Sequence, residues 1–164
     1  MATRIGSIVI VRHGQPHADR SVRVDRRGFR DWWANYDLSP LHPDEKPPPG
    51  LLHLAERSDI IFASTLQRAI HTAEMIAGGR QIITDPVFVE APLPPPPLAG
   101  KRRPSVWGVY ARAAWWVGMS EGGETKGQAQ TRAQAAVATL TAEEVTGHNV
   151  LLCCHASFNR MMRA

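Results

Sequence analysis

Short apolar segments, separated by helical patterns, most constrain the fold of this chain. Residues 7–11, 59–63 and 149–154 are nearly continuous apolar runs, which are typical of strands buried on both faces of a sheet. Residues 81–84 and 86–89 predict a further strand with a kink between its two halves. Because helical segments lie between the strands, the predicted fold is an α/β three-layer sandwich, a mainly parallel sheet with helices on both faces.

Helical patterns occur in five segments between and after these strands. The predicted helices cover residues 29–36, 66–77, 106–117, 125–146 and 157–164. Ser64 or Thr65 can cap the second of these helices, and a pair of glycines ends it. The proline-rich residues 41–50 and 91–104 are expected to be loops. Since no linker divides the chain, we expect residues 1–164 to form a single domain.

The composition indicates a globular protein. Apolar residues make up 43% and charged residues 21% of the 164 residues, and the net charge is +4, an excess that suits an anionic ligand. No apolar run reaches the roughly 20 residues of a membrane span. The first residues hold too short an apolar stretch for a signal peptide. We therefore expect a cytoplasmic protein.

The two cysteines, Cys153 and Cys154, are adjacent in the last predicted strand. Neighbouring side chains of a strand point to opposite faces, so we expect two buried packing residues and no disulfide between them. No CxxC pair, zinc-finger spacing or Walker A sequence occurs in the chain. A disulfide scaffold, a zinc finger and a P-loop nucleoside triphosphatase are therefore not expected.

Polar side chains follow each of the predicted strands. Arg12 and His13 come after the first strand, and Arg68 lies within one helical turn of the second. Glu90 follows the third strand and His155 follows the last. Ligands of parallel α/β sheets bind beyond the carboxyl ends of the strands, so we expect these side chains to share one edge. This hypothesis requires the two imidazoles to lie on that edge and to be within reach of solvent.

Such a set of side chains suits phosphoryl transfer. The reaction needs a nucleophile, positive charge near the three equatorial oxygens and a proton donor for the leaving oxygen. Arginine binds phosphoryl oxygens through its forked donors, and histidine can be a nucleophile or a donor. A carboxyl group can protonate a leaving alcohol.

Motifs of defined spacing contain these residues. They are Arg12-His13-Gly14, Ser64-x-x-x-Arg68-Ala69-x-x-Thr72-Ala73, Glu90 after the third strand, Gly122-Gly123-Glu124, and the last strand with His155. In order and spacing, from about residue 5 to the end, they resemble the histidine phosphatase (phosphoglycerate mutase-like) superfamily. The short tail after the last strand and the limited room for a lid favour a small phosphatase over a sugar-phosphate mutase.

The resemblance implies a role for each residue. His13 matches the nucleophile, which becomes a phosphohistidine, and Glu90 matches the general acid that protonates the leaving group. Arg12, Arg68 and His155 match the groups that bind the phosphoryl oxygens. The family typically needs no metal, and we expect no cofactor. The implied function is hydrolysis of the phosphomonoester of a small molecule.

Some residue assignments stay open at this stage. Glu124 is a rival proton donor, although a carboxylate at this position is also stabilised by the helix dipole. His17 is a further candidate phosphate ligand. Asp19 is the nearest counterpart of an asparagine that contacts phosphate in many relatives, and its negative charge would repel phosphate if it pointed inward.

The substrate and partners also stay open. A phosphoprotein is an alternative substrate, as in a protein phosphohistidine phosphatase, and a catalytically silent phosphate-binding module is an alternative function. The arginines between Arg20 and Arg30 could steer anionic substrates to His13. They would also suit a nucleic-acid binder, but no recognised RNA motif accompanies them. We therefore expect neither a membrane nor a nucleic acid as partner, and the oligomeric state is not predicted.

Overall fold

The computed structural model describes residues 5–164, and residues 1–4 lie outside this range. Four strands form one sheet: β1 (Ser7–Arg12), β2 (Ile60–Ala63), β3 (Ile82–Thr84) and β4 (Asn149–Cys154). Their order is β1-β4-β2-β3, and every neighbouring pair is parallel. The predicted parallel sheet is therefore confirmed. Because all strands run the same way, their carboxyl ends meet at one edge.

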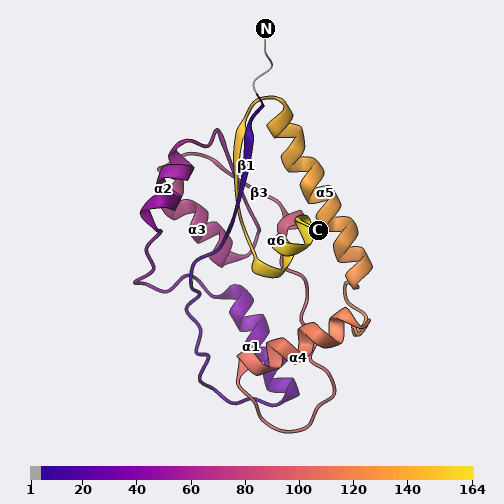
Figure 1. Ribbon diagram of the computed structural model, residues 1–164. Helices are drawn as coiled ribbons and strands as arrows, with labels where there is room; N and C mark the ends of the chain where they lie inside the picture. Colours follow the sequence, from indigo (N-terminus) through magenta and orange to yellow (C-terminus); the bar gives the residue numbers. More distant parts are fainter. Residues whose placement is uncertain (1–4) are drawn as a thin grey trace.

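Helices cover both faces of this sheet (Figure 1). On one face, α2 (Pro49–Glu56) packs against α3 (Gln67–Ala77), which contacts β2 and β4. On the other face, α5 (Lys126–Val145) and α6 (Ala156–Met162) pack against each other and the sheet. This arrangement confirms the predicted three-layer α/β sandwich. Within residues 5–164, no helix has both the length and the apolar character of a membrane span.

The side chains of β4 alternate between the two layers of the core. Val150, Leu152 and Cys154 pack in the cluster with α5, whereas Leu151 and Cys153 pack in the cluster with α3. Both cysteines are buried and free, as expected. Burial raises the pKa of each thiol to about 12, because an apolar surrounding disfavours the thiolate.

Two further helices lie together beyond the carboxyl ends of the strands (Figure 1). They are α1 (Arg26–Leu38), which is capped by the Asp25 side chain, and α4 (Pro104–Trp116). Phe29 of α1 stacks on Trp107 of α4 with 5.9 Å between ring centroids, and both side chains are fully buried. The indole N–H of Trp107 donates to the Val24 carbonyl at 2.7 Å. This aromatic cluster holds α1 and α4 over the sheet edge.

Three local predictions are wrong. Residues 86–89 do not form a strand, because Pro86–Phe88 is a short 3-10 helix whose first turn is capped by the Asp85 side chain. The predicted loop over residues 41–50 is two residues too long and an unpredicted helix follows it, because α2 begins at Pro49. A proline is tolerated there because its missing N–H costs no helical hydrogen bond. The strand β1 is only partly buried, because it lies at an edge of the sheet.

Candidate active site

His13 lies just after β1, where its backbone N–H donates to the Cys154 carbonyl at 2.9 Å. Its Nδ1 atom is 2.7 Å from the Gly14 carbonyl oxygen, which can only accept, so Nδ1 bears the proton and donates. The lone pair of the imidazole is then on Nε2. The Gly14 N–H donates in turn to the Thr72 hydroxyl at 3.0 Å, which ties the loop to α3. The ring is therefore fixed in one tautomer and one orientation.

Burial keeps His13 neutral. Its side chain is 8% exposed, and desolvation lowers its pKa to about 4, with the charges of Arg68 and Arg12 acting in the same direction. At neutral pH, Nε2 consequently offers an unprotonated lone pair. That is the state that a nucleophile requires.

Arg68, in the first turn of α3, places its guanidinium against this lone pair. Its Nε donates to His13 Nε2 at 3.2 Å. Its Nη1 donates to the Asp37 carboxylate at 3.0 Å and to the Tyr36 carbonyl at 3.3 Å, both at the end of α1. The Tyr36 ring lies under the guanidinium, with 4.6 Å from Cζ to the ring centroid. The Arg68 side chain is only 1% exposed, and the carboxylate, the carbonyl and the aromatic ring together compensate its buried charge.

His155 follows β4 and lies on the same edge as His13, with 5.1 Å between the ring centroids. Its Nε2 is 2.8 Å from the Ser64 hydroxyl, whereas its Nδ1 is buried without a hydrogen-bond partner. The requirement that both imidazoles reach solvent is wrong for His155, which is fully buried at the start of α6. The requirement was too strict, because a ring in contact with His13 needs to reach only a group bound at His13 and not bulk solvent. Burial lowers its pKa to about 2.

A cavity of about 570 Å³ opens above His13 and Arg68. Arg12 and Glu90 also line it, so four of the five predicted side chains reach one cavity, and the fifth, His155, contacts the His13 ring. The Glu90 carboxylate accepts hydrogen bonds from the Ser157 and Phe158 amides of α6, at 3.2 and 3.0 Å, and from the Ala91 amide at 2.9 Å. These three donors hold the carboxylate at the wall of the cavity.

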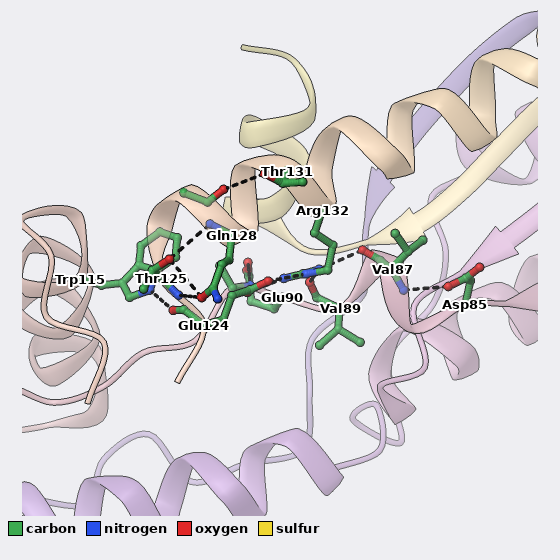
Figure 2. A network of polar contacts seen from close by, with 12 residues as sticks. Asp85, Val87, Val89, Glu90, Trp115, Glu124, Thr125, Gln128, Thr131 and Arg132 are labelled. Carbon is green, nitrogen blue, oxygen red and sulfur yellow. Dashed lines mark hydrogen bonds and ion pairs between the residues drawn. The ribbon is translucent and has the colours of Figure 1, made fainter. Parts of the chain in front are cut away.

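Glu124 lies outside this cavity. Both of its oxygens accept from Arg132, at 2.7 and 2.8 Å. Arg132 also donates to the carbonyls of Val87 and Val89, at 2.9 and 2.6 Å, as Figure 2 shows. Glu124 therefore orients an arginine that fixes the segment immediately before Glu90.

The other two open positions also lie away from the cavity. His17 is exposed, and its ring packs against His42 with 5.2 Å between centroids. Asp19 accepts hydrogen bonds from the backbone and hydroxyl of Ser21, at 2.8 and 2.6 Å. These bonds lower the pKa of the Asp19 carboxyl and keep the carboxylate in its own turn.

Several residues of the site escaped sequence analysis. Tyr36 is predicted only as the last residue of a helix and Asp37 has no predicted role, although both bind Arg68. Ser64 is expected only to cap a helix; its hydroxyl accepts from the Leu66 N–H at the start of α3, at 3.3 Å, and it also bonds His155 at 2.8 Å. Ser64 and Thr72 belong to the motif that contains Arg68, so a role for them at the site could have been predicted. Nothing in the local sequence connects Asp37 with Arg68. Within residues 5–164, no group of three or more His, Cys, Asp or Glu side chains is placed to hold a metal ion.

A neutral imidazole nitrogen, three guanidinium groups and a carboxylate thus share one cavity, a combination suited to phosphoryl transfer. The family model of the histidine phosphatase superfamily, branch 1, matches residues 8–164. The chain therefore belongs to the histidine phosphatase superfamily. Among curated proteins, none matches the sequence significantly.

Solved structures of this superfamily have the same fold. A mycobacterial glucosyl-3-phosphoglycerate phosphatase is 22% identical, with a TM-score of 0.62 over 98% of this chain and 79% of that chain. The phosphoserine phosphatase of Entamoeba histolytica is 17% identical, with a TM-score of 0.54 over 94% and 76% of the two chains. The phosphoglycerate mutase of Bacillus anthracis is 14% identical, with a TM-score of 0.58 over 98% and 79%.

Proposed function

We propose that this chain is a phosphomonoesterase that hydrolyses small phosphorylated molecules through a phosphohistidine at His13. The observation that carries the proposal is the Arg68 Nε–His13 Nε2 contact of 3.2 Å at the base of a cavity. It places a nucleophilic lone pair next to a group that binds phosphoryl oxygens. The names of two structural neighbours, a glucosyl-3-phosphoglycerate phosphatase and a phosphoserine phosphatase, support a small substrate.

In the first step, Nε2 of His13 attacks phosphorus in line with the leaving oxygen. The N–P bond forms and the P–O bond to the leaving group breaks. Protonated Glu90 gives its proton to the leaving oxygen, so the alcohol departs neutral and the carboxylate remains. The Nδ1–H bond to the Gly14 carbonyl stabilises the positive charge that the imidazole gains.

In the second step, a water molecule attacks the phosphohistidine. The Glu90 carboxylate takes one proton from this water, the O–P bond forms and the N–P bond breaks. Inorganic phosphate leaves, Nε2 recovers its lone pair, and Glu90 is protonated again for the next turnover. One carboxyl group thus acts first as acid and then as base.

Three groups stabilise the charge on the transferred phosphoryl group. Arg68 exchanges its bond with Nε2 for bonds with phosphoryl oxygens, and Arg12 provides donors from the cavity wall. The unpaired Nδ1 of His155 is a buried nitrogen that gains a partner if a phosphoryl oxygen reaches it from His13. By analogy with oxyanion donors, loss of one such donor costs about 3 kcal/mol of barrier, or about 100-fold in kcat.

The test is to trap the phosphohistidine, which is labile in acid, by rapid quenching. Labelled phenyl phosphate is mixed with the protein, the reaction is quenched in alkali, and the label on the protein is counted before and after acid treatment. We expect an acid-labile adduct on the wild type and none on His13→Ala. His17→Ala, a substitution of an exposed histidine outside the cavity, should retain both adduct and turnover. An adduct that persists in His13→Ala would overturn the mechanism.

Measurements of binding and turnover separate the alternatives. If the wild type binds phosphate but neither it nor any variant hydrolyses a substrate, the chain is a silent binding module. Turnover of a phosphohistidine-bearing protein, with none of small phosphomonoesters, would assign the phosphoprotein alternative instead.

A further inference from the structure

We propose that the leaving group of the substrate is apolar and flat, such as an aromatic ring, and that it lies between α1 and α4. This inference rests on the proposed function, because it concerns the part of the substrate beyond the phosphoryl group. The wall of the cavity that faces away from the sheet supplies the observations.

One face of α4 forms most of this wall. Its residues recur at helical spacing and are Ser105, Gly108, Val109, Arg112, Ala113 and Trp116. Trp33 and Tyr36 of α1 line the cavity too, and their rings stack with 5.1 Å between centroids. Tyr36 is buried and its ring carries the Arg68 guanidinium, so a flat ligand between these two helices would contact the partly exposed Trp33 ring, and aromatic rings favour stacked or edge-on partners.

Large apolar side chains at this wall are open to solvent. Val109 is 67% exposed and Trp116 is 49% exposed, and both line the cavity. Exposed apolar surface gathered around a cavity is typical of a binding site for an apolar group. An aromatic leaving group would bury this surface, whereas a polyol would leave its own hydroxyls against it without partners.

The charged group of this wall, Arg112, is held by two backbone carbonyls and an aromatic ring. The two terminal nitrogens of Arg112 donate to the carbonyls of Ala91 and Pro92, at 3.2 and 3.3 Å, and its Cζ lies 5.1 Å from the Trp115 ring centroid. The Tyr36 hydroxyl accepts from Arg20 at 3.4 Å. An apolar leaving group would leave these bonds in place.

Gly108 provides an independent observation. A glycine within a helix is destabilising relative to alanine, yet Gly108 is in the middle of α4. A Cβ atom at this position would meet no heavy atom within 4 Å, so no neighbouring side chain requires the glycine. The absence of a side chain at Gly108 leaves open space in the cavity that this residue lines. That space lies where the leaving group extends from the phosphoryl site.

The first experiment compares two substrates with leaving groups of the same chemical kind. Both 2-phenylethyl phosphate and glycerol 1-phosphate release a primary alcohol, so the comparison reports binding of the leaving group. We expect kcat/KM to be at least about tenfold higher for 2-phenylethyl phosphate. Equal rates, or preference for the glycerol ester, would overturn the inference and leave the phosphatase function standing.

Binding of the matching phosphonates, which cannot be hydrolysed, separates this inference from the proposed function. We expect 2-phenylethylphosphonate to bind at least about tenfold more tightly than the glycerol analogue in calorimetry. If turnover is absent but this preference is present, the proposed function fails and the inference about the apolar site holds. If both phosphonates bind equally, the inference fails.

Two variants test the position of the pocket. Gly108→Leu fills the open space and should lower kcat/KM for 2-phenylethyl phosphate at least about tenfold, with inhibition by inorganic phosphate unchanged. Gly50→Leu, at an equally open glycine of α2 away from the cavity, should change neither. Val109→Ser should repeat the effect of Gly108→Leu, whereas Val117→Ser, at an exposed residue outside the cavity, should not. Equal effects within either pair would contradict the proposal.

Discussion

Arg68 donates through Nε to the Nε2 atom of His13, and through Nη1 to Asp37 and Tyr36. The two sets of bonds divide the guanidinium into a fixed end and an exchangeable end. When a phosphoryl group approaches Nε2, only the Nε bond has to break, because α1 retains the Nη1 bonds. A buried arginine can thus bind substrate without giving up the anion that compensates its charge.

The protonation of His13 can be measured directly. Because burial lowers its pKa to about 4, we expect Nε2 to remain unprotonated throughout the neutral range. Nitrogen chemical shifts in a pH titration should show Nδ1 protonated, Nε2 unprotonated, and a midpoint near pH 4. A midpoint near the ordinary value of 6.5 would mean that burial does not keep the nucleophile neutral.

The stability of the protein should depend on pH because two histidines are buried neutral. Burial lowers the pKa of His13 to about 4 and of His155 to about 2, from 6.5 in each case. The unfolded chain therefore binds more protons below pH 6.5, so the free energy of unfolding should fall as the pH drops from 6.5. For each histidine the expected slope approaches about 1.4 kcal/mol per pH unit well below pH 6.5 and averages about 1 kcal/mol between pH 6.5 and 5.5, because the unfolded imidazole is only partly protonated there.

Urea unfolding at pH 6.5, 6.0 and 5.5 measures this slope, in a range where most carboxylates are still ionised. His13→Asn should reduce the fall in the free energy of unfolding between pH 6.5 and 5.5 by about 1 kcal/mol. A free energy of unfolding that is constant over this range would contradict the prediction.

The ion pair between Asp37 and Arg68 should contribute to stability. Desolvation raises the pKa of the Asp37 carboxyl, while the adjacent Arg68 acts in the opposite direction and favours the ionised form. Asp37→Asn leaves Arg68, which is almost fully buried, with a neutral partner. We expect a loss of about 2 kcal/mol in urea unfolding. Asp31→Asn, at an exposed residue of the same helix, should change stability by less than about 0.5 kcal/mol.

Arg132 should position Glu90 without contacting substrate. Its bonds to the carbonyls of Val87 and Val89 fix the segment that ends in Glu90. We expect Arg132→Met to lose about 2 kcal/mol of stability, since hydrogen bonds to a charged group are lost. Misplacement of the carboxylate should lower kcat by up to about 100-fold with little change in KM.

Glu124→Gln is the matched control for this variant. It weakens the ion pair but leaves the bonds from Arg132 to the two carbonyls (Figure 2). It should reduce stability while kcat stays near the wild-type value. Equal losses of kcat in the two variants would mean that the ion pair, and not the carbonyl bonds, positions Glu90.

Much of the architecture follows from local sequence patterns. Apolar runs of strand length identified β1, β2 and β4, and the periodic segment after Ser64 identified α3. The strand ends also predicted that His13 and Arg68 would share one sheet edge, because all strands of a parallel sheet end on the same side. Glu90 reaches the same cavity from the segment after the 3-10 helix and not from a strand end. Periodicity and strand ends are properties of neighbouring residues, so they can be read from the chain alone.

Tertiary packing decided the remaining features. The burial of His155, the pairing of Arg68 with Asp37 and the engagement of Glu124 by Arg132 join residues from separate elements, and no local pattern encodes these contacts. The same holds for the cavity wall, which exists only because α4 packs against α1 beyond the sheet. The sequence by itself determined which side chains could perform the chemistry. The packing of helices on the sheet determined which of them meet, because charge compensation and exclusion of water depend on neighbours in space.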